Sequence, residues 1–145
     1  MVMEKAHVIG IDPGRQKYGI AVMTMSGRPV LRRVVPVESF ESVFSHLLRE
    51  YRPKVVVVGD RTAADQCHER LENLIRAIDY PVQIETVAEH CSSEEGRRRY
   101  LIEHRKGWRR LVPLGLQWPN EPYDDYVAEV LVLRYLQQEA VPEDM

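Results

Sequence analysis

Cysteine is scarce in this sequence and long apolar stretches are missing, and both absences narrow the class of protein. Cys67 and Cys91 are the two cysteines among 145 residues, too few for a disulfide scaffold or a cysteine-based zinc site. No apolar run approaches the roughly 18 residues of a membrane-spanning helix. The first residues lack a signal-peptide core and lead at once into an expected strand. We therefore expect a cytoplasmic protein without zinc.

The composition is that of one ordinary globular domain. Apolar residues make up 44% of the chain and charged residues 29%, so a hydrophobic core is expected and disorder is not. We expect residues 1–138 to form a single domain, and the acidic residues 139–145 to form a frayed tail.

The net charge of −2 conceals an asymmetry. Residues 97–110 carry seven Arg or Lys residues and one acid, a local charge of +6, so the remainder of the chain carries −8. Such a segment can attract a polyanion, or it can be a solvated helix face with a loop. The charge alone leaves both interpretations open.

Apolar periodicity predicts strands at the beginning of the chain and alternating helices and strands after them. The first three strands are joined by short connections, so they are expected to be antiparallel, because a parallel crossover needs a dozen or more residues. Four consecutive valines predict a strand that is buried on both faces. The expected strands are residues 7–11, 18–25, 30–37, 55–58 and 82–87, and the expected helices are residues 40–51, 62–78, 92–104 and 122–138.

Three helix starts carry polar residues suited to capping. Ser39 is a candidate N-cap, Thr62 with Asp65 is another, and Ser92 with Glu95 fits a capping box. Taken together, the order of elements is typical of an α/β protein with the ribonuclease H-like fold. That fold has a five-stranded mixed sheet, the first three strands antiparallel, with helices on both faces.

Carboxylates follow the strands that should be neighbours in this sheet. Asp12 ends the first strand, Asp60 the fourth, and Glu89 follows the fifth, while Asp124 and Asp125 open the last helix. Each has an ordinary explanation by itself, as a turn residue, a loop acid or a helix N-terminal acid. Together they predict a cluster at one edge of the sheet, because the central strand ends there and the last helix can cross that edge.

Clustered carboxylates repel one another unless a cation neutralises them. Mg²⁺ and Mn²⁺ prefer hard oxygen ligands of this kind. Two such ions about 3.5–4 Å apart can activate water and stabilise both oxygens in phosphodiester hydrolysis. The cluster therefore favours a nuclease with two divalent ions.

Three segments resemble the YqgF/RuvX family of Holliday-junction resolvases, which is also linked to processing of precursor 16S ribosomal RNA. Residues 9–22 look like the family's opening strand and hairpin, and their Asp-Pro-Gly also resembles RuvC. Residues 88–93 are similar to the segment after the fifth strand, and residues 125–136 to the last helix. The resemblance implies a ribonuclease H-like nuclease.

By this resemblance, Asp12, Glu89 and Asp125 are the catalytic acids that hold the metal, and Asp124 substitutes for Asp125 or assists it. Ala88 and His90 replace the family's Asp and Arg. Family members usually end the fourth strand without an acid, whereas RuvC-like enzymes have a metal-binding acid there. Asp60 is therefore a further ligand or a loop acid.

Cations and aromatic rings occur together in residues 97–118. Arginine binds phosphates bidentately, and rings stack on splayed bases, so the segment is a candidate nucleic-acid surface. The tryptophans, Trp108 and Trp118, can instead pack the segment onto the body. The residues assigned to nucleic acid are Arg15 and Lys17 beside the carboxylates, Arg97 and its neighbours Arg98 and Arg99, and Arg105, Lys106, Arg109 and Arg110.

The sequence thus predicts a metal-dependent nuclease acting on structured RNA or DNA. The alternative is a non-catalytic nucleic-acid-binding or ribosome-assembly module on the same fold, which the altered residues 88 and 90 favour. A nucleotide-binding fragment of the actin or sugar-kinase type is a third reading, although such proteins need two domains to enclose a nucleotide. A homodimer would be required for paired cuts in a four-way junction.

Overall fold

The computed structural model describes residues 6–61, 63–78, 81–105, 107–117, 119 and 121–140. Its strands are β1 (His7–Asp12), β2 (Lys17–Thr24), β3 (Pro29–Pro36), β4 (Val55–Gly59) and β5 (Gln83–Val87). Its α-helices are α1 (Phe40–Tyr51), α2 (Ala64–Ile78), α3 (Ser92–His104) and α4 (Asp124–Ala140), and short 3-10 helices are η2 (Val37–Ser39), η3 (Gly107–Leu111) and η4 (Leu114–Leu116). The expected strands and helices are confirmed to within about two residues at most ends.

The five strands form one mixed sheet in the order β3-β2-β1-β4-β5. β1 pairs antiparallel with β2, and β2 pairs antiparallel with β3, whereas β1–β4 and β4–β5 are parallel. This confirms the expected α/β architecture, in which β1 is central. The carboxyl ends of β1, β4 and β5 therefore meet at one edge.

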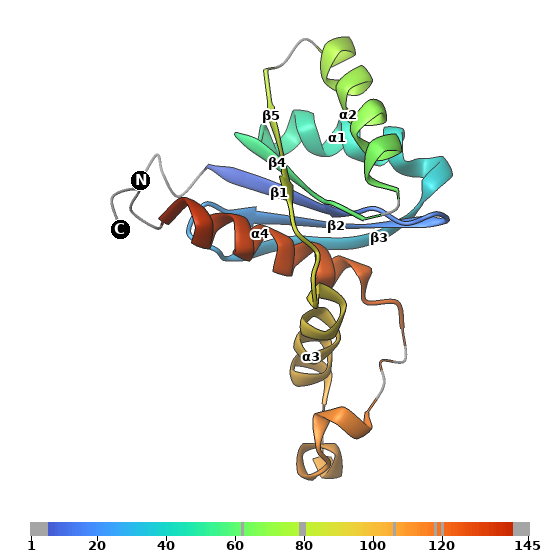
Figure 1. Ribbon diagram of the computed structural model, residues 1–145, viewed down its shortest axis with the longest axis vertical. Helices are drawn as coiled ribbons and strands as arrows, with labels where there is room; N and C mark the ends of the chain where they lie inside the picture. The colour runs from blue at the N-terminus through green and yellow to red at the C-terminus, as the bar shows by residue number, and fades with distance from the viewer. Residues whose placement is uncertain are drawn as a thin grey trace.

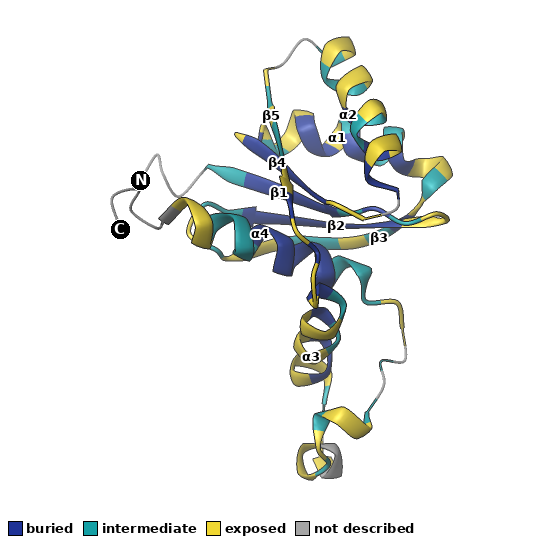
Figure 2. Ribbon diagram, in the orientation of Figure 1, coloured by how far each residue is buried: buried dark blue, intermediate teal, exposed yellow. Residues whose placement is uncertain are grey.

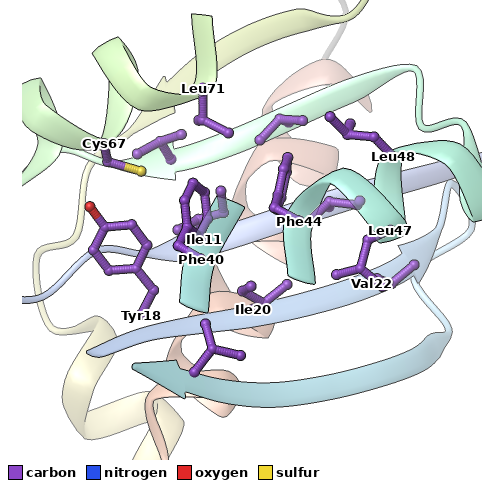
Figure 3. Packing of buried hydrophobic residues seen from close by; sticks show 14 residues of the cluster. Ile11, Tyr18, Ile20, Val22, Phe40, Phe44, Leu47, Leu48, Cys67 and Leu71 are labelled. Atoms are coloured by element: carbon purple, nitrogen blue, oxygen red, sulfur yellow. The ribbon is translucent and has the colours of Figure 1, made fainter. Parts of the chain in front are cut away.

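Helices α1 and α2 cover one face of the sheet, and α4 covers the other (Figure 1). The larger core lies beneath α1 and α2, where Tyr18, Phe40 and Phe44 pack with aliphatic residues of the sheet (Figure 3). The β4 valines are buried, as expected for a strand covered on both faces. None of the helices in the described part of the chain is long and apolar enough to span a membrane.

Helix α3 extends away from the sheet on the side of α4, and its outer surface is largely exposed (Figures 1 and 2). Its inner side packs on α4 through a small cluster of Tyr100, Leu101 and Tyr126. Gly96 faces Val127 so closely that an added Cβ would lie 2.6 Å from its side chain. The segment with η3 and η4 lies at the far end of this projection (Figure 1).

Helix capping differs from the sequence-based expectation. The N-cap of α3 is Cys91, with φ of 60° and no side-chain cap bond, so the capping box predicted at Ser92 and Glu95 is wrong. Ser92 is instead buried within the first turn. Ser39 is the N-cap of α1 but makes no side-chain cap bond. Thr62 lies outside the described residues, as do residues 141–145 of the expected tail.

Gly10 in β1 allows α4 to cross the sheet closely. A Cβ at this position would lie 2.6 Å from the main-chain oxygen of Ala128 and 2.5 Å from Val132 Cγ2. We predict that Gly10→Ala lowers the free energy of unfolding by about 1–3 kcal/mol, because overpacking a buried contact forces backbone shifts. Urea denaturation measures the change. Gly115→Ala is the control, since no atom of the described residues, apart from its chain neighbours, lies within 4 Å of its added Cβ, and equal effects of both variants would contradict the interpretation.

Candidate active site

Asp12 and Glu89 come together at the edge where β1, β4 and β5 end. Asp12 is the last residue of β1, and Glu89 follows β5 by two residues. Their carboxyl groups lie close enough for Glu89 to raise the pKa of Asp12. Glu89 is only 2% exposed although it carries a carboxyl group, so it is held inside the protein rather than in a solvated loop. The structure therefore brings together two of the predicted site residues from opposite halves of the domain.

Gly59, the last residue of β4, makes room for Glu89. An added Cβ at this glycine would lie 2.3 Å from Glu89 Cδ and 2.5 Å from Oε2. No other amino acid leaves that space, so the Glu89 side chain lies directly against the end of β4. The close approach fixes the carboxylate beside Asp12.

The surroundings of Asp12 strongly raise the pKa of its carboxyl group. Burial, the hydrogen bond to Glu89 and the negative charges of Glu89 and Asp124 raise the pKa of Asp12 from 3.8 to about 9, and the positive charge of Arg61 opposes them. At neutral pH the pair therefore retains one proton when no cation is bound. A divalent cation would neutralise the pair in place of that proton.

Asp60 and Arg61 lie in the loop after β4 and contact Glu89. The main-chain N–H of Arg61 donates to Glu89 Oε2 at 2.8 Å, and its Nη2 donates to the main-chain oxygen of Glu89 at 3.3 Å. The main-chain N–H of Glu89 donates to Asp60 Oδ1 at 3.0 Å. Sequence reasoning missed Arg61, whose only signal is its position directly after an acid at a strand end.

Helix α4 begins against β2, and this contact brings Asp124 to the same edge. Gly19 pairs with Asp12 across the sheet, and its added Cβ would lie 2.0 Å from the main-chain oxygen of Asp124. The Asp124 charge raises the pKa of Asp12. Lys17 Nζ lies 3.3 Å from Asp124 Oδ2, which is buried and accepts no hydrogen bond from any described residue. Asp124 Oδ2 is thus balanced by the Lys17 charge, without a hydrogen bond from the described residues.

Asp125, the next residue of α4, has a different set of contacts. It lines a cavity of about 520 Å³ together with Arg32, Glu103 and Tyr126, and its Oδ1 accepts the main-chain N–H of Tyr126. Burial raises the pKa of Asp125, and the positive charge of Arg32 opposes this. The charges that act on Asp12 come from Glu89 and Asp124, which favours Asp124 as the third carboxylate, and the sequence-based choice of Asp125 stays a prediction.

The donor set fits a hard divalent cation in its chemistry. Asp12, Glu89 and Asp124 offer only carboxylate oxygens, and Oδ2 of Asp124 is buried with Lys17 as its ion-pair partner. Within the described ranges, however, no three His, Cys, Asp or Glu side chains already surround a common point suited to a metal ion. Cation binding by these three carboxylates would therefore need a side-chain rearrangement and loss of the Asp12 proton.

The basic residues divide into two groups. Arg15 is exposed in the loop between β1 and β2, close in sequence to Asp12, and Lys17 is paired with Asp124. On the projection, Arg98 and Arg110 are exposed and Arg105 is half-buried. Lys106 lies outside the described residues, as do Trp118 and the side chains of Trp108 and Arg109, so their assigned roles stay predictions.

Two arginines of α3 make structural contacts instead of facing solvent freely. Arg97 Nη1 donates to the main-chain oxygen of Gln117 at 2.8 Å, which ties α3 to the end of the projecting segment. Arg99 Nε donates at 2.8 Å to Glu129, which is 1% exposed, and Arg32 Nη1 donates to the same carboxylate at 2.8 Å. A phosphate ligand for Arg99 would have to compete with this buried acid.

The proton on Asp12 makes stability depend on pH in a defined direction. Between pH 4 and 9 the folded protein holds a proton that the unfolded chain has released, so stability falls as the pH rises. We predict a loss of up to about 1.4 kcal/mol per pH unit in the metal-free protein, relative to Asp12→Asn. Urea denaturation across pH 5–8 measures it, with the exposed Glu69→Gln as control. Parallel pH profiles of wild type and Asp12→Asn would contradict the shared proton.

Comparisons with known proteins identify the fold. No protein-family model and no curated protein sequence matches the chain. Among solved structures, Thermus thermophilus RuvC in complex with a Holliday junction substrate has 16% sequence identity and a TM-score of 0.56, covering 93% of this chain and 96% of that chain. Fowlpox virus resolvase in complex with substrate Holliday junction DNA has 12% identity and a TM-score of 0.57, covering 93% and 99%. The chain therefore has the ribonuclease H-like fold of these resolvases.

Proposed function

We propose that this protein is a nuclease that hydrolyses phosphodiester bonds in structured nucleic acid. The observation that carries the proposal is the meeting of Asp12 and Glu89 with Asp124 at one sheet edge, where the pKa of Asp12 is strongly raised. Buried carboxylates are costly to ionise, and enzymes that use divalent cations have such clusters. Asp12, Glu89 and Asp124 would hold Mg²⁺ or Mn²⁺, in two sites as the sequence suggests.

The chain's own residues have separate tasks in this proposal. When bound, the ions supply charge neutralisation and a water of lowered pKa. Asp12 and Glu89 give up their proton and present oxygen atoms, while Lys17 forms an ion pair with Asp124 at the same edge. Arg15, exposed in the neighbouring loop, is placed to contact a phosphate of the substrate.

Four-way-junction DNA is the first substrate to test. Two resolvases of the same fold have structures with Holliday junction DNA, and this likeness motivates the choice. The sequence resemblance to the YqgF/RuvX family makes structured ribosomal RNA precursors the second. Paired cuts in a junction would need a homodimer.

The projecting helix α3 supplies a surface for the phosphate backbone. Arg98 is exposed on α3, Arg105 is half-buried directly after it, and Arg110 is exposed on η3. Since these residues stand on a segment that extends from the sheet, they would contact the strand at a distance from the scissile bond (Figure 1). Their contribution is expected to be electrostatic and independent of sequence.

Substitution of single carboxylates tests the catalytic assignment. We predict that Asp12→Asn and Asp124→Asn each lower the rate of Mn²⁺-dependent junction cleavage about 100-fold or more, roughly 3 kcal/mol, because charge stabilisation at the reacting phosphate is lost. Asp125→Asn is the matched control from the same helix turn, and its rate should stay within about threefold of wild type. A large loss in Asp125→Asn with activity retained in Asp124→Asn would reverse the assignment.

Salt dependence tests the basic surface. We predict that Arg98→Ala and Arg110→Ala each reduce the slope of log affinity against log salt by about one, because each removes a phosphate contact. Fluorescence anisotropy with a labelled junction, in EDTA, measures binding without cleavage. Arg49→Ala, an exposed residue on α1, is the control and should leave the slope unchanged. Unchanged slopes in both Arg98→Ala and Arg110→Ala would remove α3 and η3 from the binding surface, whereas binding without turnover under any metal would favour the non-catalytic module.

A further inference from the structure

The loops after β4 and β5 hold each other through hydrogen bonds in both directions. Asp60 Oδ1 accepts the main-chain N–H of Glu89 at 3.0 Å. In return, Glu89 accepts the main-chain N–H of Arg61 at its Oε2 atom, and the Arg61 guanidinium at its main-chain oxygen. Main chain and side chain of Glu89 are thus both fixed by two consecutive residues of one loop.

The Asp60 carboxylate differs from the other acids of the site. Asp60 is exposed, whereas Glu89 is 2% exposed and lies against Gly59. Asp60 Oδ1 already accepts a hydrogen bond from the main-chain N–H of Glu89. The charges that raise the pKa of Asp12 come from Glu89 and Asp124. The contacts of Asp60 are therefore those of a residue that shapes the loop.

We propose that Asp60 is a positioning residue, which holds Glu89 beside Asp12 through the hydrogen bond to the Glu89 main chain and does not bind the cation. The effect of Asp60 on cleavage rests on the proposed nuclease function. The hydrogen bond itself does not, because it exists in the metal-free protein.

Two substitutions of Asp60 separate the roles. Asp60→Asn keeps an Oδ1 acceptor for the Glu89 N–H but removes the negative charge that a cation ligand would supply. Asp60→Ala removes both, and leaves the Glu89 N–H without its acceptor. A positioning residue is therefore rescued by asparagine, and a ligand is not.

The test compares wild type, Asp60→Asn and Asp60→Ala, with the exposed Glu69→Gln and Glu69→Ala as matched controls on α2. We expect the hydrogen-exchange protection of the Glu89 amide, measured by NMR in EDTA, to fall about fivefold or more in Asp60→Ala only. Mn²⁺ affinity by calorimetry and the turnover rate for junction cleavage should stay within about twofold of wild type in Asp60→Asn and fall in Asp60→Ala.

Two results would overturn the inference. Unchanged protection of the Glu89 amide in Asp60→Ala would show that the contact does not hold the loop. A loss of Mn²⁺ affinity about tenfold or greater in Asp60→Asn, with that amide still protected, would make Asp60 a ligand. If wild type neither binds Mn²⁺ nor cleaves, the nuclease proposal fails, and the amide measurement in EDTA still decides whether Asp60 positions Glu89.

Discussion

The burial of Glu89 against Asp12 is the constraint on which the arrangement of this edge depends. Two carboxyl groups in contact away from water cannot both ionise without compensation, so the pair retains a proton or binds a cation. The fold nevertheless places them there: Gly59 leaves space for Glu89, and the Asp60–Arg61 loop binds it by its main chain and side chain. A buried carboxyl pair with a strongly perturbed pKa is typical of functional sites, which supports the proposed role of this edge.

Helix α4 connects this edge with the rest of the molecule. Its start is fixed by the close approach of Asp124 to Gly19, and its middle crosses β1 at Gly10. On its other side it carries Glu129, which is buried between Arg32 of β3 and Arg99 of α3. The same helix therefore delivers a carboxylate to the sheet edge and anchors the projecting helix, so that the acidic site and the basic surface have a fixed relation.

Much of the fold could be predicted because its periodicities are strong. The valine run from Val55 to Val58, the helical spacing between Phe40 and Tyr51 and the short early connections define the sheet order. The choice between Asp124 and Asp125 could not be made in this way. Consecutive residues of a helix differ by about 100° around its axis, and the contact with Gly19, which sets the rotation of α4, is not visible in the sequence. The contact of Arg61 with Glu89 depends likewise on two loops that are distant in sequence.

In the proposed nuclease, Asp12, Glu89 and Asp124 share a divalent cation in place of the proton between Asp12 and Glu89. The most direct measurement is anomalous diffraction from a crystal soaked in MnCl₂, at a pH high enough to ionise the pair. We expect an anomalous peak within coordination distance of Asp12 and Glu89. Asp124 should lie on the same side of the ion, and Asp125 should lie outside the coordination shell of the ion. An ordered site without a peak at saturating Mn²⁺, with Asp12 and Glu89 still hydrogen-bonded to each other, would contradict it.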